Sequence, residues 1–133
     1  MRRRADWPER LMAYLDGIGR RPFAWGTWDC ALFVAGAIEA MTGDDPAAAL
    51  RGQYDDALGA RRVLIERLGV WDMTGLFDRH CERVVPALAQ RGDLTVVRGC
   101  GAVVLDARRV AVLLAGRDRI GFVPIGERAW RVG

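Results

Sequence analysis

Apolar residues recur at helical spacing in the first part of the chain. The run Asp6–Glu9 contains an early proline and is typical of a helix start with Asp6 as N-cap, and the apolar pattern continues to the glycines at 17 and 19. A second run opens at Asp29 or Cys30 and continues to Met41. It is apolar on nearly all sides, which predicts a central, buried helix.

Two further helical segments follow. Residues 54–68 place apolar side chains on one side and charged side chains on the other, and residues 71 to about 81 form a shorter segment of this kind. The pattern then changes to short β-rich runs separated by Gly, Asp and Arg turns, at 94–97, 102–105, 110–114, 120–123 and 129–132. These runs predict an antiparallel β-meander.

Helices first and strands second predict an α+β fold, with the helices packed on one face of the sheet. We expect one domain over residues 1–133, with a helical part at about 6–82 and a sheet part at about 91–132.

Composition excludes several classes of active site. The 133 residues include 20 basic and 17 acidic side chains, but no lysine, serine or asparagine and one histidine, His80. Without serine there is no Ser-His-Asp hydrolase, and without lysine there is no P-loop or Schiff base. Without asparagine there is no N-glycosylation and no Cys-His-Asn triad, and one histidine excludes a site of several imidazoles.

The net charge of +3 is modest, and acidic and basic residues are interspersed, so no nucleic-acid binding is expected. The dense basic run Arg2–Arg4 is expected to be a frayed terminus. No apolar stretch is long enough to span a bilayer, and the N-terminus lacks the apolar core of a signal peptide. Cys30, Cys81 and Cys100 are an odd number without scaffold spacing, which indicates a reducing compartment or assembly inside a cell.

Cys30 is the candidate nucleophile. It stands at the start of the predicted buried helix, and Trp25 and Trp28 precede it closely, so we expect at least one of these rings to line its pocket. Unpaired N–H groups and the helix dipole favour a thiolate there, would lower the pKa of the thiol, and could donate to an oxyanion. The alternative is a structural role, since buried cysteines usually pack as small apolar side chains.

The segment before the second helix reads Trp25-Gly26-Thr27-Trp28-Asp29-Cys30, with Phe33 one turn further on. It resembles the nucleophile motif of the NlpC/P60 superfamily of papain-like cysteine peptidases, although its spacer is shortened to two residues. The run Arg91-Gly92-Asp93-Leu94 is similar to the Pro-Gly-Asp-Leu turn into the first strand of that family's sheet. The resemblance covers roughly Trp7 to Val132 and implies a papain-like fold and cleavage of peptidoglycan stem peptides. Compact sequences of this type look like those encoded in tail modules of phages, prophages and gene-transfer agents.

The sequence departs from that family at the catalytic base. A histidine normally begins the second strand and takes the proton of the thiol, whereas here Cys100-Gly101 stands at this point. The polar residue that normally follows on the next strand is also missing, because residues 110–114 are all apolar. General-base assistance is worth about 100- to 10,000-fold, so a working peptidase would need a substitute.

His80 is the one imidazole that could act as substitute base. It lies within Phe77–Glu82, near a predicted helix end, and its alternative role is that of a surface or helix-capping histidine. With the three cysteines it could also be counted as a metal set, but no Cys-x-x-Cys exists and the adjacent His80 and Cys81 point different ways. We therefore expect neither a metal nor a cofactor.

We expect a structural or assembly component of a phage-type tail tip or baseplate, with a degenerate NlpC/P60-like fold and a vestigial Cys30. One alternative is an active cysteine endopeptidase that cleaves peptidoglycan stem peptides during tail penetration, with His80 or a partner's residue as base. Another is a small binding module or chaperone used in tail assembly. The expected partners are other tail or baseplate proteins, with peptidoglycan as a further candidate, and the expected location is the virion tail tip after assembly in the bacterial cytoplasm. The candidate binding residues are Trp25, Trp28, Asp29 and Cys100.

Overall fold

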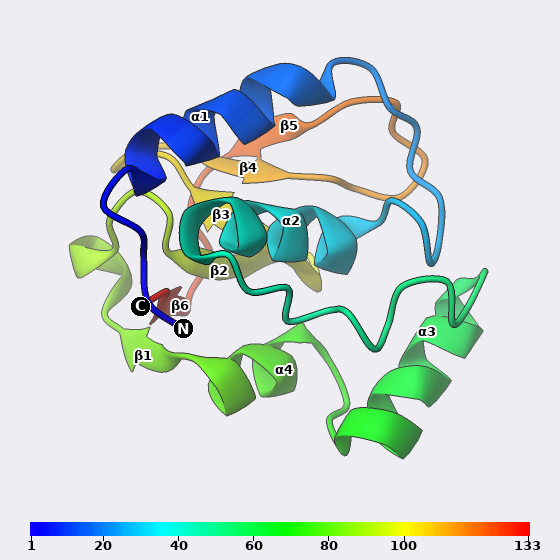
Figure 1. Cartoon of the computed structure of the whole chain (residues 1–133). Coiled ribbons are helices and arrows are strands. Elements are labelled where there is room, and N and C mark those ends of the chain that lie inside the picture. Colours follow the sequence, from blue (N-terminus) through cyan, green and yellow to red (C-terminus); the bar gives the residue numbers. More distant parts are fainter.

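The computed structural model describes all 133 residues and has the α+β fold that the sequence predicts (Figure 1). The helices come first, and six antiparallel strands form one sheet. The helical elements are α1 (Trp7–Ile18), α2 (Cys30–Thr42), α3 (Ala57–Val63), the π-helical turn η1 (Leu64–Leu68), α4 (Met73–His80) and the short 3-10 turn η2 (Pro86–Leu88). The strands are β1 (Glu82–Val84), β2 (Leu94–Val97), β3 (Cys100–Val104), β4 (Val110–Val112), β5 (Gly121–Val123) and β6 (Ala129–Arg131).

The strands lie in the order β1-β6-β2-β3-β4-β5. The predicted meander accounts for β2 to β5, which pair in sequence order. β6 returns to the other side of β2, where Trp130 pairs with Leu94. Trp130 is fully buried there, whereas Phe122 on the edge strand β5 is 58% exposed, so the return of β6 gives the large ring a buried place. The sequence did not predict β1, because its first two residues are charged and exposed.

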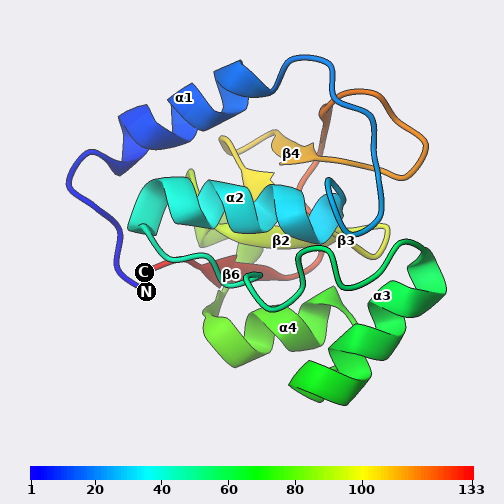
Figure 2. The ribbon, with the colours of Figure 1, turned by 45° about the vertical axis from the view of Figure 1, so that its right-hand side comes forward.

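α2 is the central helix, as its apolar composition predicts. Leu32, Phe33 and Val34 are at most 1% exposed, and burial of each contributes about 1.5–3 kcal/mol. α2 contacts α1 on one side and β3 on the other (Figures 1 and 2). Gly36 permits the approach of α1, because a Cβ there would collide with the hydroxyl group of Tyr14. That hydroxyl donates a hydrogen bond of 2.8 Å to the carbonyl of Phe33.

Two helix starts differ from the sequence-based expectation. Asp6 precedes α1 as expected, but its backbone is not extended, and its carboxylate pairs with Arg10 at 2.9 Å instead of capping the helix. The helix predicted over residues 54–68 begins only after Asp56, which accepts a hydrogen bond from the N–H of Gly59 and so acts as the N-cap.

Arg3 and Arg4 are held in place, so the prediction of a frayed terminus is wrong for these two residues. The N–H of Arg4 donates to the carbonyl of Met41 at 2.8 Å. The guanidinium of Arg3 donates to the carbonyl of Val132 at 2.6 Å and to the carboxylate of Asp93 at 2.7 Å. These long-range bonds hold the first residues against the end of the chain, and both termini lie side by side in Figures 1 and 2.

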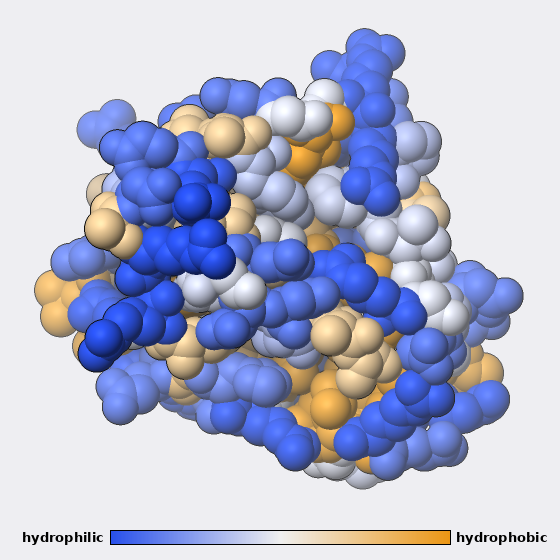
Figure 3. Space-filling model, in the orientation of Figure 1, coloured by the Kyte–Doolittle hydropathy of each residue, from blue (hydrophilic) through white to orange (hydrophobic).

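Most of the surface in view is hydrophilic, with apolar atoms gathered below α2 in the region between α4 and α3 (Figure 3). The helices are too short or too polar for any of them to cross a membrane.

Candidate functional site

The segment before α2 forms a tight loop that leads into Cys30. Ala24 and Trp28 form a β-bridge through two backbone hydrogen bonds of 2.8 Å. Gly26, inside the loop, has a φ of 79°, and a Cβ at this position would overlap the carbonyl oxygen of Tyr54. The loop therefore requires glycine for both its backbone conformation and its close contact with the segment after α2.

Asp29 joins this loop to α2 and to Tyr54. Its side chain is buried, with a residue exposure of 1%. The carboxylate accepts hydrogen bonds of 3.0 Å from the N–H groups of Leu32 and Gly26, and one of 2.6 Å from the hydroxyl of Tyr54. The bond from Leu32 is the N-cap of α2. Because both carboxylate oxygens have internal donors, Asp29 positions Cys30, and its oxygens are not free for the binding role predicted from sequence.

Cys30 meets a second thiol rather than an imidazole. It is the first residue of α2, is 8% exposed, and lines the same pocket as Cys100, the first residue of β3. The candidate nucleophile and Cys100, both identified in the sequence, are thus brought together by the packing of α2 on β3.

The two thiols differ in pKa. The neighbouring thiol of Cys100 raises the pKa of the Cys30 thiol, and burial and the negative charge of Asp29 act in the same direction, while the backbone N–H of Gly101 opposes them. The expectation of a lowered pKa at Cys30 is therefore wrong, because these three effects outweigh that of the helix start. The interaction with Cys30 lowers the pKa of Cys100 to about 7 against the opposing effect of burial. Cys100 is the more acidic of the two thiols, and it is also the more exposed.

A pocket of about 280 Å³ opens beside the thiol pair. Trp25 and Trp71 line it together with Tyr54, and the charged side chains of Arg61 and Arg98 line it as well. No histidine lines this pocket. The site therefore offers two thiols and a backbone N–H donor, within reach of aromatic and cationic side chains.

Over residues 2–132 the sequence matches a family described as a domain of unknown function, DUF6950. The chain belongs to the DUF6950 family. No curated protein matches it in sequence. The part of the chain that matches DUF6950 contains both thiols, the capping aspartate and the whole sheet.

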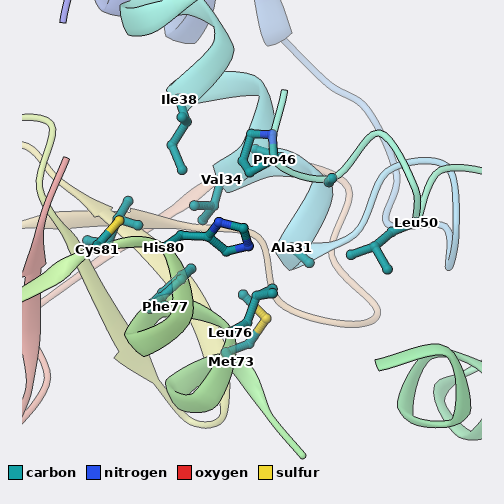
Figure 4. Close-up of a pocket in the computed structure, with 13 residues that line it drawn as sticks. Ala31, Val34, Ile38, Pro46, Leu50, Met73, Leu76, Phe77, His80 and Cys81 are labelled. Atoms are coloured by element: carbon teal, nitrogen blue, oxygen red, sulfur yellow. The ribbon is translucent and has the colours of Figure 1, made fainter. Parts of the chain in front are cut away.

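His80 of this DUF6950 domain lies outside the Cys30 pocket. It ends α4 and lines a separate hollow between α2 and α4. Its ring lies there among apolar side chains from α2, from α4 and from the loop after α2 (Figure 4). Ala31, Leu50 and Met73 line both hollows and so stand between the imidazole and the thiol pair. Partial burial lowers the pKa of the His80 imidazole. In this arrangement His80 supplies no base to Cys30.

The two tryptophans before α2 have different environments in the DUF6950 domain. Trp25 lines the pocket and lies edge-on to Phe23, with 4.8 Å between the ring centroids. Trp28 is only 5% exposed and packs edge-on against Phe33 at 6.0 Å, with the guanidinium of Arg21 4.2 Å from its ring centroid. Burial of this large ring beside the first turn of α2 stabilises the core. Trp28 is therefore a core residue, which corrects the binding role predicted for it.

The sequence did not indicate three residues that line the pocket: Tyr54, Trp71 and Arg98. Tyr54 and Trp71 belong to segments expected to be helical, and neither position indicates a neighbour as distant in sequence as Cys30. The position of Arg98 could have been inferred, because Arg98-Gly99 separates two β-rich runs and so indicates a hairpin turn. In the structure Arg98 lies in this turn with a φ of 52°. No group of three or more His, Cys, Asp or Glu side chains in this DUF6950 domain is arranged to hold a metal ion.

Alkylation should distinguish the three cysteines. The pKa of Cys100 is lowered to about 7, whereas burial raises the pKa of Cys81 to about 11. Because the thiolate is the reactive form, iodoacetamide should modify Cys100 first, with a rate that rises through about pH 7 and levels off above it, while Cys81 and Cys30 react slowly. Peptide mass spectrometry after timed labelling measures each rate. Labelling of Cys30 ahead of Cys100 would contradict this order of acidity.

Proposed function

We propose that this chain is a structural or assembly component of a phage-type tail tip or baseplate, built on an NlpC/P60-like domain that no longer works as a peptidase. The motif from Trp25 to Cys30 and the turn at Gly92-Asp93 supply the resemblance to that superfamily. The proposal places the protein in the virion tail after assembly in the bacterial cytoplasm, among other tail or baseplate proteins.

One observation carries the proposal: the pocket of Cys30 contains a second thiol, Cys100, and no histidine lines it. In peptidases of the resembled type, an imidazole at the start of the second strand accepts the proton of the nucleophile. Here the neighbour raises the pKa of Cys30 and keeps the proton on its sulfur. Loss of the general base costs about 100- to 10,000-fold in rate, so the pocket retains the shape of a nucleophile site without its means of activation.

Exposed apolar side chains support a role in assembly. Trp71 is 72% exposed, Leu58 68% and Leu88 67%, and each lies in or beside a short helical turn on the outside of the domain. Tryptophan is enriched among the residues that anchor protein interfaces, and a protein that enters a larger particle buries such side chains against its neighbours. Each of these exposed side chains is suited to contact with another protein.

The purified protein is expected to release no stem-peptide fragments from peptidoglycan above the level of its Cys30→Ala variant. The physical reason is the missing imidazole beside a protonated thiol. Chromatography of digested muropeptides measures the release. Turnover that disappears in the Cys30→Ala variant would reject the proposal in favour of the endopeptidase. Mass spectrometry of purified tail particles then separates a virion component, which should be present, from a chaperone that leaves before completion.

A further inference from the structure

We propose that Cys30 and Cys100 form a redox-active dithiol, which small anionic disulfides oxidise to an internal disulfide between α2 and β3. This reaction is independent of the tail role proposed above and needs no peptidase activity. The substrate class is a low-molecular-weight disulfide that carries carboxylates, of which oxidised glutathione is the probe.

The first support is that two thiols from distant parts of the chain meet in one pocket. Cys30 and Cys100 are about 70 positions apart, yet α2 packs on β3 and both cysteines line the same hollow. The third cysteine, Cys81, lies between α4 and β1, does not line that hollow and has no thiol partner. Cys81 therefore shows how a thiol outside the pocket reacts, against which the pair can be compared.

The second support is that the two sulfurs differ in access. Cys30 is buried at 8% exposure behind the loop at Gly26, while Cys100 is half-buried beside the turn at Arg98. A reagent that enters the pocket therefore reaches Cys100 first. Cys100 is also the more acidic thiol, with its pKa lowered to about 7 by the interaction with Cys30.

The third support is the charge around the pocket. Arg61 and Arg98 line it, and neither forms an ion pair with a carboxylate. The lining also contains Asp29 and Asp72, which cap α2 and α4 and keep their negative charges. Asp29 is buried at 1% exposure, whereas Arg61 and Arg98 are exposed. A disulfide that carries carboxylates therefore meets two guanidinium groups without ion-pair partners at the surface of the pocket, and this favours its entry.

The exchange takes place in two steps that balance. The thiolate of Cys100 attacks one sulfur of the small disulfide, which releases one small thiolate and leaves a mixed disulfide on Cys100. Cys30 then gives its proton to solvent and attacks the sulfur of Cys100, which releases the second small thiolate and forms the Cys30–Cys100 bond. The two released thiolates take up the two protons. The protein loses two electrons, and the small disulfide gains them.

The surroundings of Cys30 assist the second step. Before oxidation, Cys100 contributes most to the raised pKa of the Cys30 thiol. Once Cys100 is a mixed disulfide, that sulfur no longer carries negative charge, and its contribution is removed. Burial and Asp29 still raise the pKa, while the N–H of Gly101 and the first turn of α2 favour the thiolate.

Intact-mass measurement after incubation with oxidised glutathione tests the proposal. In the Cys81→Ala variant, which keeps the pair, we expect the loss of two hydrogens and peptides joined through Cys30 and Cys100. In Cys81→Ala/Cys30→Ala, glutathione should stay attached to Cys100, because the resolving thiol is absent. In Cys81→Ala/Cys100→Ala, modification should be slower by about tenfold or more, because the remaining thiol is buried. Circular dichroism confirms that each variant is folded.

Two results would overturn the proposal. The first is that both thiols of folded Cys81→Ala are still free when the unfolded control has already reacted with oxidised glutathione. The second is that the two double variants react at equal rates. A second comparison tests the substrate class. Arg61→Gln/Arg98→Gln should react about tenfold more slowly with oxidised glutathione, but at an unchanged rate with the neutral disulfide of 2-mercaptoethanol. Equal slowing with both reagents would reject the preference for anions. Neither readout depends on peptidoglycan or on tail particles, so this proposal and the proposed function fail separately.

Discussion

Replacement of Trp130 by alanine is expected to lower the free energy of unfolding by about 3–5 kcal/mol, the largest effect of any substitution considered. Trp130 is fully buried on β6, between β1 and β2. Its ring packs edge-on to Phe77 with 5.2 Å between centroids, and its indole N–H donates to Asp78 at 2.8 Å. Alanine leaves a cavity between the sheet and α4 and removes the bond that ties α4 to β6. Urea denaturation followed by circular dichroism measures the change.

Trp71→Ala is the matched control, because it removes the same side chain from a position that is 72% exposed. Its effect on the free energy of unfolding should stay within about 0.5 kcal/mol. Similar losses for the two variants would show that the position of Trp130 in the core is not the source of its contribution. Trp130→Phe, which keeps a ring but no donor, should lie between them.

Replacement of Asp93 by alanine is expected to lower the free energy of unfolding by about 3 kcal/mol, the lower end of the range for removing one partner of a buried ion pair. Asp93 is fully buried and accepts hydrogen bonds from Arg3 at 2.7 Å, the N–H of Gln90 at 2.9 Å, and both Arg131 and the N–H of Val132 at 3.4 Å. Its loss leaves these donors without an acceptor. The two guanidinium groups are partly exposed and regain water, which keeps the cost at the lower end. Urea denaturation measures it.

Limited proteolysis gives a second readout for Asp93→Ala. Because Arg3 is held by Asp93 and by the carbonyl of Val132, cleavage near the N-terminus should become faster in the variant. Asp118→Ala, whose carboxylate is 59% exposed in the native protein, is the control and should change neither stability nor cleavage. An unchanged cleavage rate in Asp93→Ala would mean that the remaining hydrogen bonds of Arg3 and Arg4 to backbone carbonyls are enough to hold the N-terminal segment.

Local patterns predicted much of this fold. The start of α2 at Asp29 or Cys30 and its burial follow from short-range signals, and so do the strands from β2 to β5. What the pattern did not indicate depends on partners far apart in sequence. β6 pairs with β2, where Trp130 is buried, and Arg3 pairs with a carboxylate 90 positions away. No local periodicity carries that information.

The site was predictable in part for the same reason. The segment before α2 identified Cys30, and the loss of histidine at the start of the second strand drew attention to Cys100. That the two thiols share a pocket depends on how α2 packs on β3. The position of His80, one hollow away, depends on the end of α4, which the sequence located only approximately. Chemistry that follows from residue type was foreseen, and chemistry that follows from distance was not.

The contact between the two ends of the chain has a practical consequence. A side chain on Gly133 would touch the backbone of Arg3, so the first and last residues are already neighbours. A short linker between them would close the chain without strain, and new ends could be opened in an exposed turn such as the one around Arg108. The domain therefore suits circular permutation, and it also suits insertion into a surface loop of a host protein. Such rearrangements must keep the hydrogen bond from Arg3 to Val132, so any linker should start after Gly133 and end before Arg2.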